Sequence, residues 1–144
     1  MQLFGTDGIR GKIAVDPATD SEAIAALFEK REISPRLFRL IGEGLGATLD
    51  ADSEVVVGWD PRPGNSNLVS SLTQGFNLRG VNVIWAGEVA TPGLQASMLS
   101  KGAAMGCMIT ASHNPVSDSG IKVFDKYGFK SMPDFEDNVS EIII

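Results

Sequence analysis

Apolar residues recur every three or four positions in several stretches of the chain, a spacing typical of amphipathic helices. The clearest stretch follows Ser34, which can cap a helix, and Pro35, which suits the first helical position. A weaker pattern lies within the polar connection 16–33, with Ser21 as the candidate N-cap. Further helices are predicted at about 66–79, closed by Gly80, and from Thr91 to Gly102, with Leu94, Met98 and Leu99 facing inward.

Short apolar runs rich in β-branched residues separate these helical stretches. They predict strands at 54–58, 81–87, 103–110 and 120–125. Strands that alternate with helices favour a three-layer α/β/α sandwich with a mixed, mostly parallel sheet. The last two strands are joined by about nine residues, too few for a crossover helix, so this pair should be antiparallel. Ligands of such sheets sit beyond the carboxyl ends of the strands, which directs attention to the loops there.

Overall charge and cysteine content narrow the choice of partners and compartment. The 144 residues (1–144) suit one compact domain, and their net charge is −6. Nucleic acids and anionic membranes select basic surfaces, so neither is expected as the main partner. A single cysteine, Cys107, fits a reducing compartment, and its place in a strand predicts inert packing. Neither a signal peptide nor an apolar run long enough to span a bilayer is visible, which predicts a cytoplasmic protein.

The C-terminal stretch FEDNVSEIII has the pattern of a helix that ends on three isoleucines without a polar tail. An apolar surface of this kind normally has something packed against it. We expect either a piece of a longer protein or an end that docks on its own core.

The stretch Thr110-Ala-Ser-His-Asn-Pro115 carries the sharpest chemical signal. It presents Ser112 at the end of a buried strand, beside the only histidine, His113, and Lys122 returns on the next strand. A serine hydroxyl among cations suits acceptance and donation of phosphate. A plain turn remains the alternative from spacing alone. A Ser-His-Asp triad gains little support, because adjacent side chains of an extended backbone point in different directions.

The opening loop FGTDGIRG, residues 4–11, combines three glycines with Arg10. Such a loop can bind an anion, with the arginine as a bidentate phosphate ligand, or it can be a Gly-rich turn with a solvated arginine. It lacks the Gly-Lys-Ser/Thr ending of a P-loop and the glycine spacing of a dinucleotide fingerprint.

Four motifs together resemble one known family. They are FGTDGIRG, a GxDxRP loop, GVxV followed by TP, and TASHNP followed by GIK. Their order and spacing resemble the first domain of the α-D-phosphohexomutases over roughly residues 1–130. Within that superfamily, the opening looks most like phosphoglucosamine mutases and related phosphomannomutase/phosphoglucomutase enzymes.

The resemblance implies a mechanism. The family's TASHNP serine, which matches Ser112, carries a phosphoryl group and gives it to a hexose 1- or 6-phosphate; the sugar turns over as a bisphosphate and returns the other phosphate. By the same match, His113 and Lys122 assist proton transfer or stabilise charge, and Arg10 faces the phosphoserine. In the family, Mg²⁺ is held by one phosphoserine oxygen, here that of Ser112, and by three aspartates of a DxDxD-type loop.

Other residues of these motifs are assigned to phosphate or substrate binding, namely Thr6, Asn114 and Arg62. Asp60 and Arg62 match the family's GxDxR loop, which is expected to support the site. This chain departs from the pattern there, because Trp59 replaces a usual basic residue and Gly64-Asn65 replaces Ser-Gly. The departures weigh against phosphate contacts from this loop, and Trp59 and Trp85 are expected to be packing residues.

The family has four domains, and this sequence matches only one. The Asp-rich metal loop, the sugar-recognition loop and the C-terminal phosphate-binding loop have no counterpart in it. The expected function is that of an intramolecular phosphotransferase acting on a hexose phosphate or hexosamine phosphate together with the remaining domains of the same enzyme. The isolated chain is expected to be inactive. The alternative is a non-catalytic α/β phosphosugar-binding module or remnant.

Overall fold

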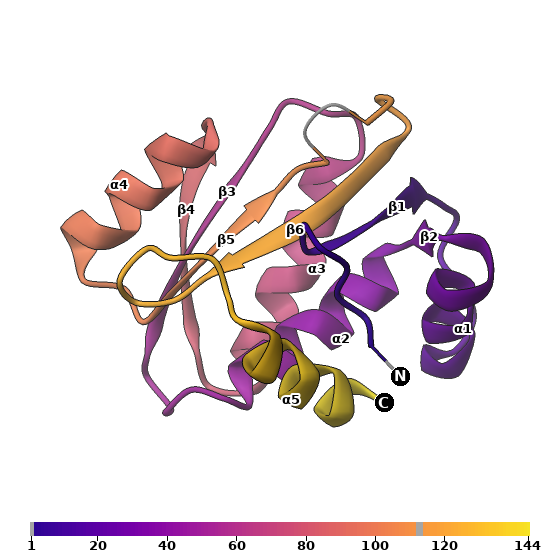
Figure 1. Ribbon diagram of the computed structural model, residues 1–144, viewed down its shortest axis with the longest axis horizontal. Helices are drawn as coiled ribbons and strands as arrows, with labels where there is room; N and C mark the ends of the chain where they lie inside the picture. Colours follow the sequence, from indigo (N-terminus) through magenta and orange to yellow (C-terminus); the bar gives the residue numbers. More distant parts are fainter. Residues whose placement is uncertain (1, 112–113) are drawn as a thin grey trace.

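A mixed sheet of six strands runs through the centre of the computed structural model, which describes residues 2–111 and 114–144 (Figure 1). The strands lie in the order β2-β1-β6-β5-β3-β4. Their bounds are β1 (Ile9–Ile13), β2 (Glu32–Ile33), β3 (Glu54–Trp59), β4 (Asn82–Glu88), β5 (Met105–Ile109) and β6 (Asp118–Phe124). β1 pairs in parallel with β2, and β3 with β4 and β5, whereas β6 is antiparallel to β1 and β5. The predicted mixed sheet and its antiparallel final pair are confirmed.

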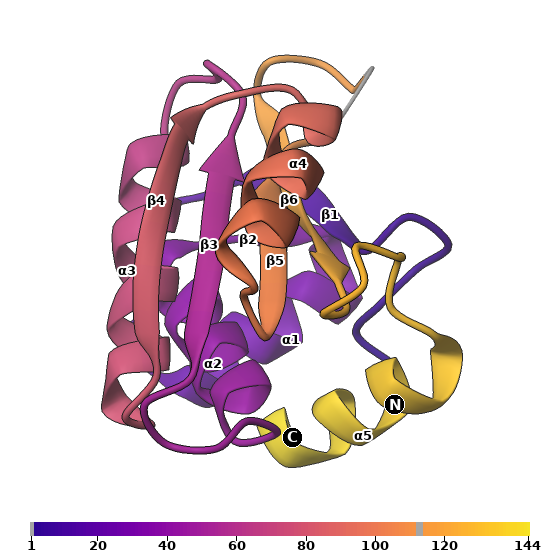
Figure 2. The same ribbon diagram turned by 90° about the vertical axis from the view of Figure 1, so that its left-hand side faces the viewer.

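Helices cover both faces of the sheet and complete the three predicted layers (Figure 2). Their bounds are α1 (Asp20–Lys30), α2 (Pro35–Gly46), α3 (Asn65–Leu78), α4 (Thr91–Lys101) and α5 (Pro133–Ile143). One large core joins α1, α2 and α3 to one face of the sheet. A smaller core joins Leu94 and Met98 of α4 to Val56 and Met108 on the opposite face. The opposite face is called the α4 side below.

The helix boundaries confirm two predicted caps and correct two details. The Ser34 hydroxyl accepts the Leu37 amide at 3.2 Å, as predicted, and Gly102 ends α4 in the left-handed conformation. The first helix is capped by Thr19, whose hydroxyl accepts the Glu22 amide, and not by Ser21, which lies inside its first turn. Leu99 was expected inward but is 52% exposed. It lies about 100° around the helix from the buried Met98, and so leaves the buried face.

The opening loop FGTDGIRG is partly a strand, which sequence reasoning missed. Residues from Ile9 onward form β1, and Ile9 is fully buried opposite Ile121. Gly8 makes this start of the strand possible, because its φ is +85° and a β-carbon there would lie 2.1 Å from the Ile121 carbonyl oxygen. Gly11 likewise lets the Arg31 carbonyl approach, where a β-carbon would be 2.5 Å away. A short strand next to glycines shows little hydrophobic periodicity in its sequence. Whether it forms a strand therefore depends on the strand with which it pairs.

Helices α2 and α3 cross with their backbones in close contact at two glycines. A β-carbon on Gly42 would lie 2.3 Å from the Leu72 carbonyl oxygen, and one on Gly75 would lie 2.1 Å from the Arg39 carbonyl oxygen. This crossing anchors α3, whose N-terminus follows the loop after β3, against the rest of the domain.

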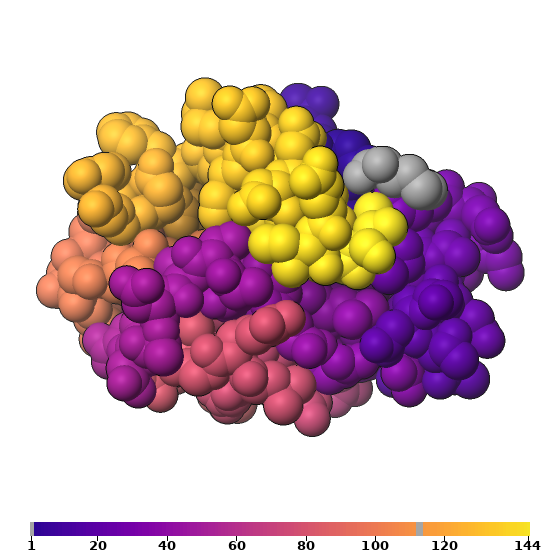
Figure 3. All heavy atoms as spheres, turned by 90° about the horizontal axis from the view of Figure 1, so that it is seen from below, coloured from indigo at the N-terminus to yellow at the C-terminus, as the bar shows by residue number. Residues whose placement is uncertain are grey.

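The C-terminal helix α5 packs against α2 and the first residues of the chain (Figure 3). The Ser140 hydroxyl accepts the Leu3 amide at 3.1 Å and donates to the Gln2 side-chain oxygen at 2.7 Å. Ile143 lies against Gly44 of α2. Ile143 therefore docks on the core, while Ile144 is 55% exposed. Among residues 2–111 and 114–144, the structure contains no helix with the length and apolarity required to traverse a bilayer.

Candidate functional site

The loops that follow β3 and β5 meet at the carboxyl ends of these strands, the upper edge of the sheet in Figure 1. Asp60, the first residue after β3, joins them. Its amide donates to the Ile109 carbonyl at 3.1 Å, and its carboxylate accepts the Thr110 hydroxyl at 2.6 Å. The end of β5 is therefore joined to the residue after β3 by one backbone hydrogen bond and one side-chain hydrogen bond.

Arg62 connects Asp60 to the residues that follow 112–113. Its Nε donates to the Asp60 carboxylate at 3.0 Å, and only 10% of its side chain is exposed. Its Nη1 donates to three backbone carbonyls, those of Asn114 at 3.0 Å, Pro115 at 2.7 Å and Asp118 at 3.1 Å. A guanidinium can hold several acceptors in one plane, and here the three carbonyls lie in the loop before β6 and in Asp118, the first residue of that strand.

Arg10 approaches the same segment from β1. Its Nη1 donates to the Ala111 carbonyl at 3.3 Å and to the Asn114 side-chain oxygen at 3.4 Å. Gly120 lies directly opposite Arg10 in the sheet, and a β-carbon there would approach the Arg10 Cγ to 2.9 Å. The glycine thus leaves room for the arginine side chain to lie across β6. Arg10 therefore contacts Ala111 and Asn114, the two residues that flank 112–113.

The remaining predicted residues take different positions. Ser112 and His113 lie outside the described residues. Lys122 is on β6 opposite Met108, a residue of the α4-side core, and therefore shares that side of the sheet with Arg10. Asn114 donates from its side-chain nitrogen to the Asp118 carboxylate at 3.3 Å. Thr6 is exposed, and its carbonyl accepts the Lys130 ammonium group.

Asn65 is a site-forming residue that sequence reasoning treated only as a departure from the family pattern. It is 1% exposed at the start of α3. Its Nδ2 donates to the Asp60 carboxylate at 2.7 Å, and its Oδ1 accepts the Ser119 hydroxyl at 2.5 Å. A buried amide needs such partners, so a polar residue in the second position after Arg-Pro was the available signal.

The aromatic and thiol predictions agree with the structure. The Trp59 and Trp85 rings form an edge-to-face pair with centroids 5.9 Å apart. This geometry stabilises aromatic contacts; Trp59 also packs against the larger core, as predicted, whereas Trp85 is 55% exposed. Cys107 is buried, and burial raises the pKa of its thiol far above the usual value, so it stays protonated.

No three His, Cys, Asp or Glu residues within 2–111 and 114–144 are grouped so that they could hold a metal ion. A phosphate oxygen alone is a poor Mg²⁺ site, because this cation prefers a near-octahedral set of oxygens. The described residues therefore do not make a complete magnesium site.

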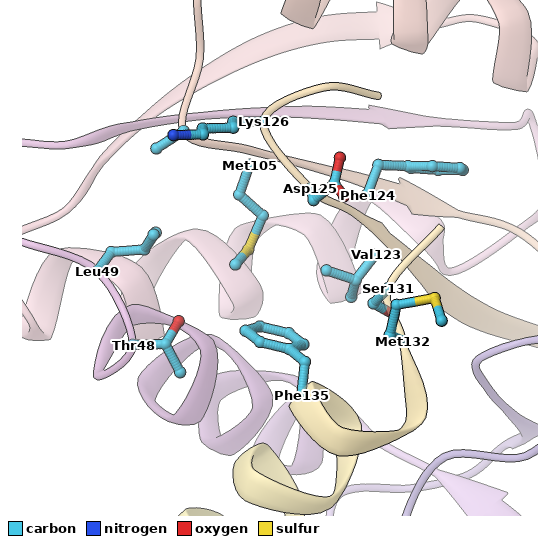
Figure 4. A pocket seen from close by; sticks show the side chains of 11 residues that line it. Thr48, Leu49, Met105, Val123, Phe124, Asp125, Lys126, Ser131, Met132 and Phe135 are labelled. Atoms are coloured by element: carbon cyan, nitrogen blue, oxygen red, sulfur yellow. The ribbon is translucent and has the colours of Figure 1, made fainter. Parts of the chain in front are cut away.

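A cavity of about 280 Å³ lies at the other end of the sheet, between the start of β5 and α5 (Figure 4). The side chains of Met105 and Phe135 point toward each other across it. It is lined mainly by apolar groups and is remote from the carboxyl ends of β3 and β5. Its composition and place separate it from the polar cluster around Asp60 and Arg10.

The sequence as a whole was compared with known proteins. The family model described as phosphoglucomutase/phosphomannomutase, alpha/beta/alpha domain I, matches residues 1–144. The chain belongs to this family. Its motifs are those of the N-terminal domain I of the α-D-phosphohexomutases, as the sequence resemblance indicated.

Individual members of the phosphohexomutase family resemble this domain along nearly all of its length. A phosphoglucosamine mutase of Parasynechococcus marenigrum (strain WH8102) is 40% identical over 127 residues, which cover 88% of this chain and 24% of that protein. One of Cereibacter sphaeroides (strain ATCC 17029) is 37% identical over 142 residues, which cover 99% of this chain and 29% of that protein. The chain thus spans less than a third of the length of these relatives.

Solved phosphohexomutase structures share the fold. A phosphomannomutase-type protein from Thermus thermophilus superposes with a TM-score of 0.78 at 28% identity, covering 99% of this chain and 30% of that one. A phosphoglucomutase/phosphomannomutase family protein from Burkholderia thailandensis gives a TM-score of 0.71 at 26% identity, covering 98% of this chain and 29% of that one.

The Arg62 contacts lead to a first prediction. In Arg62→Met, the amides of Asn114 and Asp118, which donate to Ala111 and Pro115, should exchange with solvent at least about tenfold faster, because hydrogen bonds from a charged donor are lost. Amide hydrogen exchange followed by NMR measures this.

Arg36→Met is the matched control. Arg36 also donates to a backbone carbonyl and a carboxylate, but its partners are Pro17 and Asp20. It should leave exchange at Asn114 and Asp118 unchanged. Equal protection of these two amides in Arg62→Met and in the parent chain would show that the loop is held without the guanidinium.

Proposed function

We propose that this domain supplies the phosphoserine of a hexose-phosphate mutase, with Ser112 as the residue that carries the phosphoryl group. The observation that carries the proposal is the convergence of two arginines on the chain around the serine. Arg10 contacts Ala111 and Asn114, the residues on either side of 112–113, and Arg62 holds the carbonyls that follow. Cations placed before the reaction lower the cost of moving a negatively charged phosphoryl group.

The proposed reaction is a pair of phosphoryl transfers that balance each other. In the first, the bond between phosphorus and the Ser112 oxygen breaks while a hydroxyl oxygen of the hexose phosphate bonds to phosphorus. The proton of that hydroxyl passes to a base, for which His113 and Lys122 are the candidates, and the departing Ser112 oxygen takes up a proton that it gives up again in the second transfer. The sugar then turns over, and its other phosphate returns to Ser112, while the sugar oxygen it leaves regains a proton.

The substrate in this proposal is a hexose phosphate, and glucosamine phosphate is the first choice because the curated relatives are phosphoglucosamine mutases. Because the described residues form no complete metal site, a Mg²⁺ ion at the Ser112 phosphate would need carboxylates from outside this chain. The remaining domains of the same enzyme are the proposed source, which also implies negligible turnover by these residues alone.

A non-catalytic phosphosugar-binding module is the second candidate. The incomplete metal site and the replacement of a usual basic residue by Trp59, which packs on Trp85, favour it. The reading frame that encodes the chain separates the two candidates. A continuation with an Asp-rich loop supports the mutase, and a stop codon after Ile144 supports the module.

Phosphate mapping on the complete protein tests the mutase proposal. After incubation with a hexose 1,6-bisphosphate, intact mass should rise by one phosphoryl group, and peptide mapping should place it on Ser112. Ser117→Ala, which removes an exposed serine from the same loop, should still be labelled. A phosphoryl group on any other residue, or none after incubation, would contradict the assignment.

A further inference from the structure

The side chain of Asn65 joins three segments near the carboxyl ends of β3 and β5. Asn65 is the first residue of α3, which begins at the upper edge of the sheet in Figure 1. Its Nδ2 donates to the Asp60 carboxylate at 2.7 Å and to the Asp60 carbonyl at 3.0 Å. Its Oδ1 accepts the hydroxyl of the buried Ser119 at 2.5 Å. The start of α3 is therefore bonded both to the loop after β3 and to β6.

The partners of Asn65 fix the orientation of its amide. An ionised carboxylate and a backbone carbonyl only accept hydrogen bonds, so the end of the amide that faces Asp60 must be the NH₂ group. The opposite end is the oxygen, to which the Ser119 hydroxyl donates. Turning the amide over would place oxygen against oxygen in a site that is 1% exposed, where the loss of partners is costly. Asn65 therefore holds a single orientation.

The Asp60 carboxylate receives donors on both of its oxygens. Oδ1 accepts the Asn65 amide, whereas Oδ2 accepts the Thr110 hydroxyl at 2.6 Å and the Arg62 Nε at 3.0 Å. Rotation of the carboxylate about its bond to the β-carbon would break bonds on both sides at once. Asn65 thus fixes the plane of the carboxylate from the side opposite to Thr110 and Arg62.

Asp60 transmits this constraint to the chain on both sides of 112–113. Thr110 lies two residues before Ser112, and the Arg62 Nη1 donates to the Asn114 carbonyl at 3.0 Å, directly after 112–113. Phosphoryl transfer depends on the placement of the oxygen that gives up the group, and a displacement of about 1 Å can cost roughly 10² in rate. Movement of Asp60 would therefore reach the proposed reaction through both neighbours.

We propose that Asn65 is a positioning residue for the phosphoryl transfer, and that it acts by holding Asp60 in the orientation that Thr110 and Arg62 require. The family resemblance does not supply this residue, because the usual pattern has Ser-Gly where this chain has Gly64-Asn65. Asn65 touches no reacting atom in this role. The inference rests on the proposed function, since the reaction that Asn65 serves is the transfer to and from Ser112.

Steady-state kinetics of Asn65→Ala in the complete protein test the role. kcat for hexose phosphate interconversion should fall roughly 10- to 100-fold, while KM should stay within about twofold of the parent value, because the side chain positions the serine and does not bind substrate. Asn77→Ala is the matched control, since Asn77 is exposed near the other end of α3. Assays well below the melting temperature of each variant separate positioning from stability. Equal kcat values for Asn65→Ala and Asn77→Ala would refute the inference.

Ser119→Ala reaches the same amide from its other end and serves if Asn65→Ala does not fold. It leaves α3 intact but removes the donor that orients the Asn65 oxygen. kcat should again fall with KM nearly unchanged, by less than in Asn65→Ala. A parental kcat in Ser119→Ala together with a tenfold rise of KM in Asn65→Ala would contradict a positioning role.

A double-mutant cycle tests the route through Asp60. Thr110→Val removes the hydroxyl that donates to the Asp60 carboxylate. With that bond absent, Asn65→Ala should lower kcat by a smaller factor than it does in the parent protein, because both changes disturb the same carboxylate. Two losses that simply multiply would show that Asn65 does not act through Asp60.

Amide hydrogen exchange in this chain gives a readout that needs no activity. The Asp60 amide, which donates to the Ile109 carbonyl at 3.1 Å, should exchange at least about fivefold faster in Asn65→Ala, and at the parent rate in Asn77→Ala. Unchanged exchange at Asp60, in a protein that is still labelled on Ser112, would overturn this inference and leave the proposed function intact. Failure of the parent protein to be labelled on Ser112 would instead overturn the proposed function, whatever the exchange rate at Asp60.

Discussion

Under the proposed function, replacement of Ser112 by alanine in the complete protein is expected to lower kcat by roughly 10⁴- to 10⁶-fold, the loss typical of removing a catalytic nucleophile. Alanine has no oxygen to carry the phosphoryl group, so the route through a phosphoenzyme disappears. A coupled assay of glucosamine phosphate or glucose phosphate interconversion, run over a range of substrate concentrations, measures the effect on kcat and on KM.

Ser117→Ala provides the matched control for this loss. Ser117 lies in the same loop and is exposed, and its hydroxyl donates to the Asp118 carboxylate over a long distance of 3.4 Å. It should keep near-parental activity. Both variants should melt at the temperature of the parent protein. Activity of Ser112→Ala equal to that of Ser117→Ala would end the assignment of Ser112.

Replacement of Gly75 by alanine should cost roughly 2–3 kcal/mol of unfolding free energy, the usual cost of forcing extra volume into a packed interior. The new β-carbon would lie 2.1 Å from the Arg39 carbonyl oxygen and 2.8 Å from the Glu43 nitrogen. Both are backbone atoms, so no rotamer change can relieve the clash, and α2 and α3 must move apart. Chemical denaturation with urea, followed by circular dichroism, measures the change.

Gly93→Ala is the control for this second prediction. Gly93 lies in α4, and a β-carbon there would be 3.5 Å from the nearest atom, on Val89, which is an ordinary contact. Alanine should therefore be neutral or stabilise by up to about 1 kcal/mol through helix propensity. A Gly75→Ala protein as stable as Gly93→Ala would show that α2 and α3 are not held at the described distance.

Much of the fold follows from local pattern. The strands around Val56 and Cys107 are apolar on both faces, and Ser34-Pro35 predicts the start of α2. These elements could be predicted because each signal lies within a few neighbouring residues. The short link between the last two predicted strands likewise predicts an antiparallel pair, since the length of the link alone forbids a crossover helix. β1 was not predicted, because its burial depends on pairing with Ile121, more than a hundred residues away in the sequence.

The candidate site, too, was predicted in part from the sequence and was in part decided only by the tertiary structure. The sequence by itself determined the family and the motif that carries Ser112, because the motifs are contiguous and ordered along the chain. Only the tertiary structure decided that Arg62 holds the carbonyls before β6 and that Asn65 is bonded to Ser119. Those contacts join segments that are distant in sequence, and their geometry is set by strand register and helix packing rather than by any local spacing.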